Sequence, residues 1–202
     1  MSRDRFATRA LILESAASII ASAGVSALGI NSLAEAAKCD KVLIYRYFGG
    51  LDGVLAALSA ERMLWPRVKL AEGGDESLAD AVQSLLLEEW AALSGSTLML
   101  ASATAELSNR GAPLGAATFE QRTELHAKMV ASLRDAHHVP PYVDLPAFVE
   151  LLSAALTVFA MRAAYSTSKS TPAFDPASPQ GWRRIEKILS AITRALLDSD
   201  GQ

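Results

Sequence analysis

Side chains that donate hydrogen bonds gather in one short segment, Ile30 to Leu51, which reads INSLAEAAKCDKVLIYRYFGGL. They are an amide, cations and phenols: Asn31, Lys38, Lys41, Tyr45, Arg46 and Tyr47. Amides and cations recognise the edges of bases in a DNA groove, whereas cations and phenols also bind phosphate oxygens. The first hypothesis for this segment is therefore recognition of a nucleic acid.

Two short helices joined by a tight turn are expected to position these groups. Ile30, Leu33, Ala34 and Ala37 stand at i, i+3, i+4 and i+7, which predicts one apolar stripe on a helix of about two turns. Residues 38–40 then interrupt the pattern. A three-residue break is typical of a helix-turn-helix unit.

The second helix is expected to follow Asp40, whose carboxylate can accept a backbone hydrogen bond and suits the positive end of the helix dipole. Ile44 and Phe48 predict its buried side, and Gly49-Gly50 predicts its end. Similar helix pairs occur in helical proteins of other functions. The spacing alone therefore leaves a half-buried aromatic stripe open as the alternative interpretation.

The distribution of charge favours the N-terminal quarter as the region that contacts a polyanion. Residues 1–50 contain six Lys or Arg and four Asp or Glu, a net charge of +2. Residues 51–202 contain thirteen and eighteen, a net charge of −5. This asymmetry adds modest support to binding of nucleic acid.

Length and composition indicate a globular chain with a substantial core, because half of its 202 residues are apolar. Two charge-free runs, 90–105 and 151–161, are shorter than the roughly 18 to 20 residues that span a bilayer, so no membrane helix is expected from them. The start lacks the apolar stretch of a signal peptide, and the single Cys39 forms no internal disulfide. These features predict a cytoplasmic protein.

The chain is expected to be all-α, because Ala and Leu dominate and turn residues divide it into helical blocks. About nine helices are predicted, with the first near 8–23 completing a three-helix bundle with the helix pair. The others are expected near 51–66, 75–94, 96–109, 113–136, 144–168 and 179–198, and Ser94-Gly95-Ser96 is either a kink or a break.

The last two predicted helices have wide apolar faces, which predict either core or a homodimer interface. The first face consists of Phe148, Leu151, Leu152, Ala155, Leu156, Phe159 and Ala163, and the second of Ile185, Ile188, Leu189, Ile192 and Leu196. Two such helices from each subunit can form a four-helix interface. Periodicity does not separate these two roles.

The N-terminal arrangement resembles the tetracycline-repressor (TetR) family over residues of about 9 to 58. The first helix reads ILESAASIIASAG, the reading unit INSLAEAAKCDKVLIYRYF, and the most specific part is IYRYF after a short turn. The resemblance implies a DNA-binding domain at 1–50 and a larger helical domain at 51–202 that binds an effector and dimerises. It also implies a homodimer whose recognition helices enter successive major grooves.

The resemblance implies roles for the polar residues identified above. Lys41, Val42 and Leu43 match the family's groove-facing positions, and Asn31 matches one in the preceding helix. Tyr45 and Tyr47 match positions that usually bind phosphate, and Arg46 is expected to contact a phosphate or a base. The implied partner is a double-stranded, partly palindromic operator.

Three positions depart from the family's pattern, and each removes or alters an expected contact with a DNA phosphate. Lys38 replaces a frequent turn Gly, Gly29 replaces a capping hydroxyl residue, and Leu51 replaces a phosphate-binding Lys. A shallower salt dependence is therefore expected, unless Lys38 and the N-terminal cations Arg3, Arg5 and Arg9 compensate. A solvated, disordered tail is the alternative interpretation of that N-terminal arm.

The resemblance also implies that the larger domain binds a small molecule whose occupancy changes the separation of the reading heads. A largely apolar or aromatic effector is expected. The candidate contacts are Trp65, Trp90, Met99, Phe119, His126, Phe159, Arg162 and Tyr165. Core packing is the alternative for each aromatic or Met side chain, because interiors need them regardless of function.

No enzyme, cofactor or metal site is predicted, because the sequence lacks a Gly-rich phosphate loop, a Gly-x-Ser-x-Gly elbow and a cluster of metal ligands. His137-His138 next to Pro140-Pro141 predicts a solvated loop, and Cys39 a small packing residue. The expected function is a ligand-released, DNA-binding repressor. The alternative is a helical interaction or adaptor module that has lost DNA binding.

Overall fold

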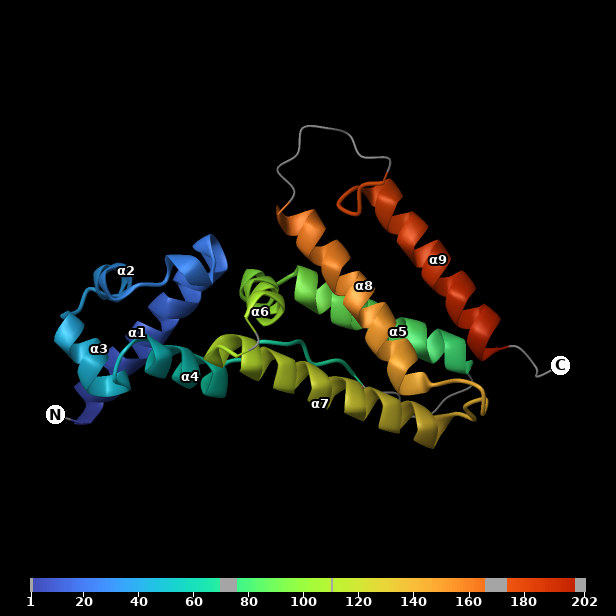
Figure 1. Ribbon diagram of the computed structural model, residues 1–202, viewed down its shortest axis with the longest axis horizontal. Helices are drawn as coiled ribbons and strands as arrows, with labels where there is room; N and C mark the ends of the chain where they lie inside the picture. Colours follow the sequence, from blue (N-terminus) through green and yellow to red (C-terminus); the bar gives the residue numbers. More distant parts are fainter. Residues whose placement is uncertain (1, 70–75, 110, 166–173, 199–202) are drawn as a thin grey trace. The chain divides into compact units, whose positions relative to one another are not determined.

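The computed structural model describes residues 2–69, 76–109, 111–165 and 174–198, with side chains from Arg5 onward. These residues form nine α-helices and no strand, as the composition predicts (Figure 1). The elements are α1 (Ser2–Ala23), the 3-10 turn η1 (Val25–Ala27), α2 (Ile30–Ala36), α3 (Lys41–Phe48), α4 (Leu51–Glu61), α5 (Leu78–Ser94), α6 (Thr97–Ser108), α7 (Pro113–Ala136), α8 (Leu145–Tyr165) and α9 (Pro179–Leu197).

Helix boundaries follow the predicted ones closely, with two differences. The N-terminal arm is not a disordered tail, because α1 begins at Ser2 and includes it. α4 ends at Glu61, earlier than predicted, since the amides of Leu64 and Trp65 donate to Gln121 Oε1 at 2.8 and 3.2 Å instead. Pro66 also disfavours a helical conformation at the residue before it.

The segment Ser94-Gly95-Ser96 is a break between two helices, not a kink. α5 ends at Ser94, and the hydroxyl oxygen of Ser96 accepts a hydrogen bond from the Met99 amide at 3.3 Å, which caps α6. The predicted helix ends at 75 and 166–168 lie outside the described residues.

The chain divides into two compact units. The first comprises Met1–Trp65 and Ser96–Gln121, and the second Pro66–Gly95 and Arg122–Gln202. The first unit is thus larger than the predicted 1–50 domain, because α4, α6 and the start of α7 pack with α1–α3. That residues 1–50 bind DNA and residues 51–202 bind an effector stays a prediction.

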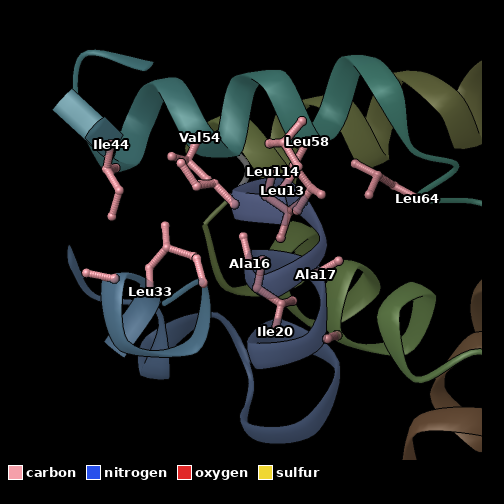
Figure 2. Close-up of a cluster of buried hydrophobic side chains, with 14 residues drawn as sticks. Leu13, Ala16, Ala17, Ile20, Leu33, Ile44, Val54, Leu58, Leu64 and Leu114 are labelled. Atoms are coloured by element: carbon pink, nitrogen blue, oxygen red, sulfur yellow. The ribbon is translucent and has the colours of Figure 1, made fainter. Parts of the chain in front are cut away.

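A continuous apolar core holds the first unit together, and α1 runs through its centre (Figure 2). Leu33 and Ile44, one from each helix of the predicted reading unit, have no exposed surface. Full burial of such a side chain stabilises the fold by about 1.5–3 kcal/mol. The other large members are Ile12, Leu13, Ile20, Val54, Leu58, Leu64 and Leu114.

A close approach between α3 and α4 sets the position of the reading unit. A Cβ atom at Gly53, in the first turn of α4, would lie 1.6 Å from the carbonyl oxygen of Phe48 at the end of α3. Only glycine therefore fits at this position. At the other end of α4, Glu61 pairs with Arg9 of α1, and Arg62 pairs with Glu14.

In the second unit, α5 packs against both α8 and α9. α9 turns Ile185 and Leu189 toward this core and leaves Ile188 and Ile192 exposed. α8 likewise has two apolar sides. Its buried side consists of Leu145, Val149, Ser153, Leu156, Thr157 and Ala160, and its exposed stripe of Leu151, Ala154, Ala155, Val158, Arg162 and Tyr165.

This division corrects the single apolar face predicted for each helix. Leu156 and Ile185 belong to the core, whereas Leu151, Ala155 and Ile188 face outward. Apolar residues on both sides of a helix blur the periodic signal, because the sequence does not say which side a neighbour covers.

Two described helices are long and apolar enough by length and composition to cross a membrane, Arg5–Ala23 and Leu145–Tyr165. This differs from the expectation of no membrane helix, which considered two charge-free runs and left out the longer one at residues 15–34. Both helices instead bury one side against helices of their own unit, with Ile12 and Ile20 at the centre of the first core and Val149 in the second.

Candidate nucleic-acid interface

The helix pair begins at Gly29, the N-cap of α2, which is extended and supplies no side-chain cap. Its amide donates to the hydroxyl oxygen of Ser32 at 2.9 Å, and the Ser32 hydroxyl in turn lies 3.0 Å from the carbonyl oxygen of Ala27. This is half of a capping box, with the hydroxyl on the helix side only. Gly29 therefore leaves no hydroxyl at the position where the family often has one.

The turn between α2 and α3 closes as a Schellman motif. The amide of Cys39 donates to the carbonyl of Ala34 at 3.0 Å, and the amide of Lys38 to that of Glu35 at 3.1 Å. Lys38 occupies the left-handed position of the motif, with φ at 49°. Glycine is usual at this position because a Cβ atom strains the left-handed conformation.

α3 is capped at both ends as predicted. The Asp40 carboxylate accepts a hydrogen bond from the amide of Val42 at 2.8 Å, and Gly49 adopts a left-handed conformation with φ at 76°. Ile44 is fully buried, whereas Val42 and Tyr45 are 64% and 56% exposed. The helix thus has one core-facing residue and a broad solvent-facing surface.

An open hollow of about 530 Å³ lies between α2 and α3 and brings several candidate contacts together. Asn31, Lys38 and Lys41, which come from the first helix, the turn and the second helix, all line it. Glu35 and Asp40 line it as well. These two carboxylates were not predicted as part of the surface.

Arginine and aromatic side chains meet at the far end of α3. The Arg46 guanidinium lies 5.1 Å from the centre of the Tyr47 ring and donates to its hydroxyl oxygen at 3.2 Å. From α1, the guanidinium of Arg5 lies 5.8 Å from the same ring, and that of Arg9 lies 5.3 Å from the ring of Phe48. The N-terminal arm therefore lies beside the predicted reading helix. Sequence periodicity does not reveal this contact.

Two further residues of this region have roles in packing. Leu51 is partly buried against the core, so the residue that replaces the family's Lys contributes apolar contacts. Cys39 is also partly buried there. Burial, followed by the charge of Asp40, raises the pKa of the Cys39 thiol, which disfavours the reactive thiolate.

The same segment matches a known sequence family. Residues 12–58 match the model of bacterial regulatory proteins, tetR family. Over these residues the chain is similar to the TetR family. A search of curated protein sequences finds no match.

Solved structures of bacterial regulators have the same fold along nearly the whole chain. A TetR transcriptional regulator from Agrobacterium tumefaciens is 20% identical, with a TM-score of 0.62 and 94% of each chain covered. The fatty acid degradation regulator FadR from Bacillus halodurans is 15% identical, with a TM-score of 0.61 and 94% of each chain covered. NalD of Pseudomonas aeruginosa is 17% identical, with a TM-score of 0.57, and the match covers 98% of this chain and 100% of NalD.

The predicted effector contacts are divided between the two units. Trp65, Met99 and Phe119 belong to the first. Trp90, His126, Phe159, Arg162 and Tyr165 belong to the second. Trp90 stacks on Trp182, with ring centres 3.6 Å apart, and Arg162 and Tyr165 lie on the exposed stripe of α8. Their roles in effector binding stay predictions.

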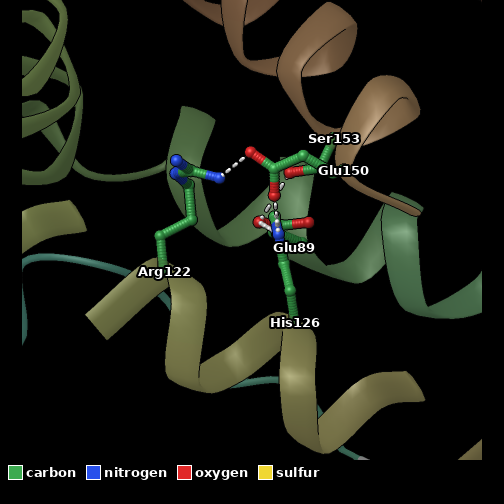
Figure 3. A network of polar contacts seen from close by, with 5 residues as sticks. All are labelled: Glu89, Arg122, His126, Glu150 and Ser153. Carbon is green, nitrogen blue, oxygen red and sulfur yellow. Dashed lines mark hydrogen bonds and ion pairs between the residues drawn. The ribbon is translucent and has the colours of Figure 1, made fainter. Parts of the chain in front are cut away.

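Among the predicted effector contacts, His126 lies in a partly buried polar network formed by side chains of α5, α7 and α8 (Figure 3). Its ring nitrogens lie 3.1 Å from Glu89 Oε1 and 2.7 Å from Glu150 Oε2. The Ser153 hydroxyl donates to Glu89 at 3.0 Å, and Arg122 pairs with Glu150. In the sequence, Glu89 is marked only by its place among the apolar positions of α5.

Burial and contacts with charged neighbours act in opposite directions on the pKa values of His126 and Glu150. Burial disfavours the charged imidazolium of His126, but hydrogen bonds and charges of Glu89 and Glu150 outweigh it, so the pKa of His126 is raised. Burial likewise opposes the charge of Glu150, yet contacts with His126 and Arg122 lower the pKa of this carboxyl. The network therefore favours a protonated His126 between two carboxylates.

Proposed function

We propose that this TetR-family regulator is a dimeric repressor that binds a partly palindromic operator and releases it when a small molecule binds. The observation that carries the proposal is the hollow lined by Asn31, Lys38 and Lys41, next to the exposed Val42 and Tyr45. Amide, ammonium, apolar and phenol groups on one helix pair suit the base edges, thymine methyls and phosphates of a major groove.

Within this surface we assign reading to α3 and the start of α2. Lys41 is exposed at the first turn of α3 and is assigned to guanine, whereas Asn31 is assigned to adenine or phosphate. Val42 and the partly buried Leu43 supply apolar contacts to thymine. Tyr45 is assigned to phosphate.

Dimerisation is assigned to the exposed apolar sides of α8 and α9. Leu151, Val158, Ile188 and Ile192 are 67%, 46%, 57% and 43% exposed. Apolar side chains at helical spacing on two neighbouring helices support an isologous four-helix interface, and the small residues of the α8 stripe allow close packing. Such a dimer would place the two half-sites about 34–36 Å apart.

The effector is expected to be largely apolar or aromatic. The related structures include a fatty acid degradation regulator and NalD, named as the secondary repressor of a multidrug efflux pump. The aromatic residues Trp90 and Phe159 in the second unit agree with such a ligand. A ligand releases DNA only if it binds the DNA-free arrangement more tightly.

Selection from a randomised DNA pool tests the proposed function, followed by fluorescence anisotropy on the enriched sequence at two salt concentrations. The expected result is a partly palindromic sequence that binds far more tightly than random DNA. Failure to enrich any sequence would contradict the proposal and favour a helical interaction module. The phosphate contacts missing at Gly29 and Leu51, and the carboxylates Glu35 and Asp40 in the hollow, are the observations that support that alternative.

Sedimentation of matched variants tests the dimer separately. Leu151→Asp and Ile188→Asp place charges in the proposed interface, so both should yield monomers that bind the operator weakly. Leu107→Asp is the control, because Leu107 on α6 is 63% exposed and lies in the other unit. A dimer that survives both interface substitutions would rule out this surface.

A further inference from the structure

Tyr47 is the point where cations from two helices meet. The Arg5 guanidinium of α1 and the Arg46 guanidinium of α3 lie 5.8 and 5.1 Å from the centre of its ring. Arg46 also donates a hydrogen bond to the Tyr47 hydroxyl oxygen at 3.2 Å. An aromatic face attracts a guanidinium electrostatically, so one ring can hold two cations that would otherwise repel each other.

The register of α1 against α3 explains why Arg5, and not Arg9, remains available. Arg5 and Arg9 stand four residues apart on one side of α1 and lie against the successive aromatic residues Tyr47 and Phe48. Arg9 is held by its ion pair with Glu61 of α4. This pair ties the first turns of α1 to the core and leaves Arg5 one turn further out, at the solvent-exposed end.

The two cations on Tyr47 are not neutralised within the described part of the chain. Neither Arg5 nor Arg46 forms an ion pair with a carboxylate of the described residues, and both side chains are exposed. Two guanidinium groups that contact the same ring and have no counter-charge are suited to the DNA backbone, because planar guanidinium groups bind phosphate with paired hydrogen bonds.

We propose that Tyr47 positions Arg5 and Arg46 as a two-arginine clamp on the DNA backbone. The proposal rests on the DNA binding proposed above and changes the role of one residue. Tyr47 acts as a positioning residue through its ring, and the guanidinium groups contact the phosphates. Sequence preference is set elsewhere, by residues that line the hollow.

Measurement of operator affinity as a function of salt tests the clamp. Each phosphate contact contributes about 0.9 to the slope of log K against log salt, so Arg5→Ala should lower the slope of a dimer by about 1.8. Arg46→Ala should act similarly and, like Arg5→Ala, should weaken random DNA as much as the operator. Arg134→Ala is the matched control, because this exposed arginine lies in the second unit.

A double-mutant cycle tests the positioning role of Tyr47. Tyr47→Leu should weaken binding, and Arg5→Ala should then cost less in that background than in the wild type. Tyr47→Phe, which keeps the ring but loses the hydroxyl, should retain most of the Arg5 contribution. Circular dichroism and thermal unfolding of each variant separate these effects from misfolding.

The outcomes distinguish the clamp from the proposed function. An unchanged salt slope in Arg5→Ala, or additive effects of Arg5→Ala and Tyr47→Leu, would overturn the clamp even if the wild type selects an operator. A loss of binding in Tyr47→Phe as large as in Tyr47→Leu would assign phosphate contact to the hydroxyl and also overturn it. If the wild type enriches no DNA sequence, the proposed function itself fails.

Discussion

His126 Nε2 lies 3.1 Å from Glu89 Oε1, and both side chains are buried. The pair joins α7 to α5 inside the second unit, and Glu150 of α8 contacts the other ring nitrogen. A buried carboxylate and imidazole are tolerated together because each satisfies the other's hydrogen bonding. The stability of this unit should therefore depend on both partners and on pH.

Removal of the Glu89 carboxylate should be strongly destabilising. Glu89→Ala leaves the Nε2 atom of His126 and the Ser153 hydroxyl without their Glu89 acceptor in the core, and loss of one partner of a buried charged pair costs about 3–5 kcal/mol of unfolding free energy. Urea unfolding measures this change. Glu120→Ala, at an exposed position on α7, is the control and should alter stability by less than about 0.5 kcal/mol. Equal effects of the two substitutions would show that the network contributes nothing.

The pH dependence of stability should reveal His126. Its raised pKa means that the folded state binds the proton more tightly than the unfolded state, so the stabilisation is complete below the ordinary pKa of about 6.5. It is lost as pH rises through the raised value. Urea unfolding across this range should show that the wild type loses stability relative to His126→Gln. The exposed His138→Gln should not change the profile.

At the acidic end the same network should act through Glu150. Because contacts with His126 and Arg122 lower its pKa, its contribution is present above the ordinary carboxyl pKa and is lost as pH falls through the lowered value. Glu150→Gln should therefore flatten the acid limb of the stability profile. A wild-type acid limb that Glu150→Gln leaves unchanged would assign that limb to other carboxyl groups.

Lys38 should show opposite effects on stability and on DNA binding. Lys38→Gly relieves a left-handed conformation that costs about 1 kcal/mol for a residue with a Cβ atom, so thermal stability should rise. The lost ammonium group should lower DNA affinity at low salt. Ala36→Gly, in the preceding helix, is the control and should destabilise by about 1 kcal/mol. Unchanged DNA binding in Lys38→Gly would remove Lys38 from the interface.

Base reading and phosphate binding should separate in variants of α3. Lys41→Ala should reduce discrimination at one base pair by about 1–3 kcal/mol, because an ammonium group facing guanine carries sequence information. Tyr45→Phe should weaken all sequences about equally, since a phenol bound to phosphate carries none. Competition assays with operator variants measure both. A uniform loss in Lys41→Ala would contradict its assignment as a base reader.

The sequence by itself determined the helix pair α2 and α3. The apolar positions of α2, the Asp40 cap and the Gly49 stop act within one or two helical turns, so their effects can be read without the rest of the fold. The predicted positions of α3 and α9 agree with the structure within one residue for the same reason.

Only the tertiary structure decided which groups far apart in the chain come together. Arg5 meets Tyr47, and His126 meets Glu89, because packing of whole helices sets these contacts. The division of α8 into a buried and an exposed apolar side was decided in the same way. Periodicity reports that a helix face is apolar, whereas the neighbouring helices determine whether it is covered.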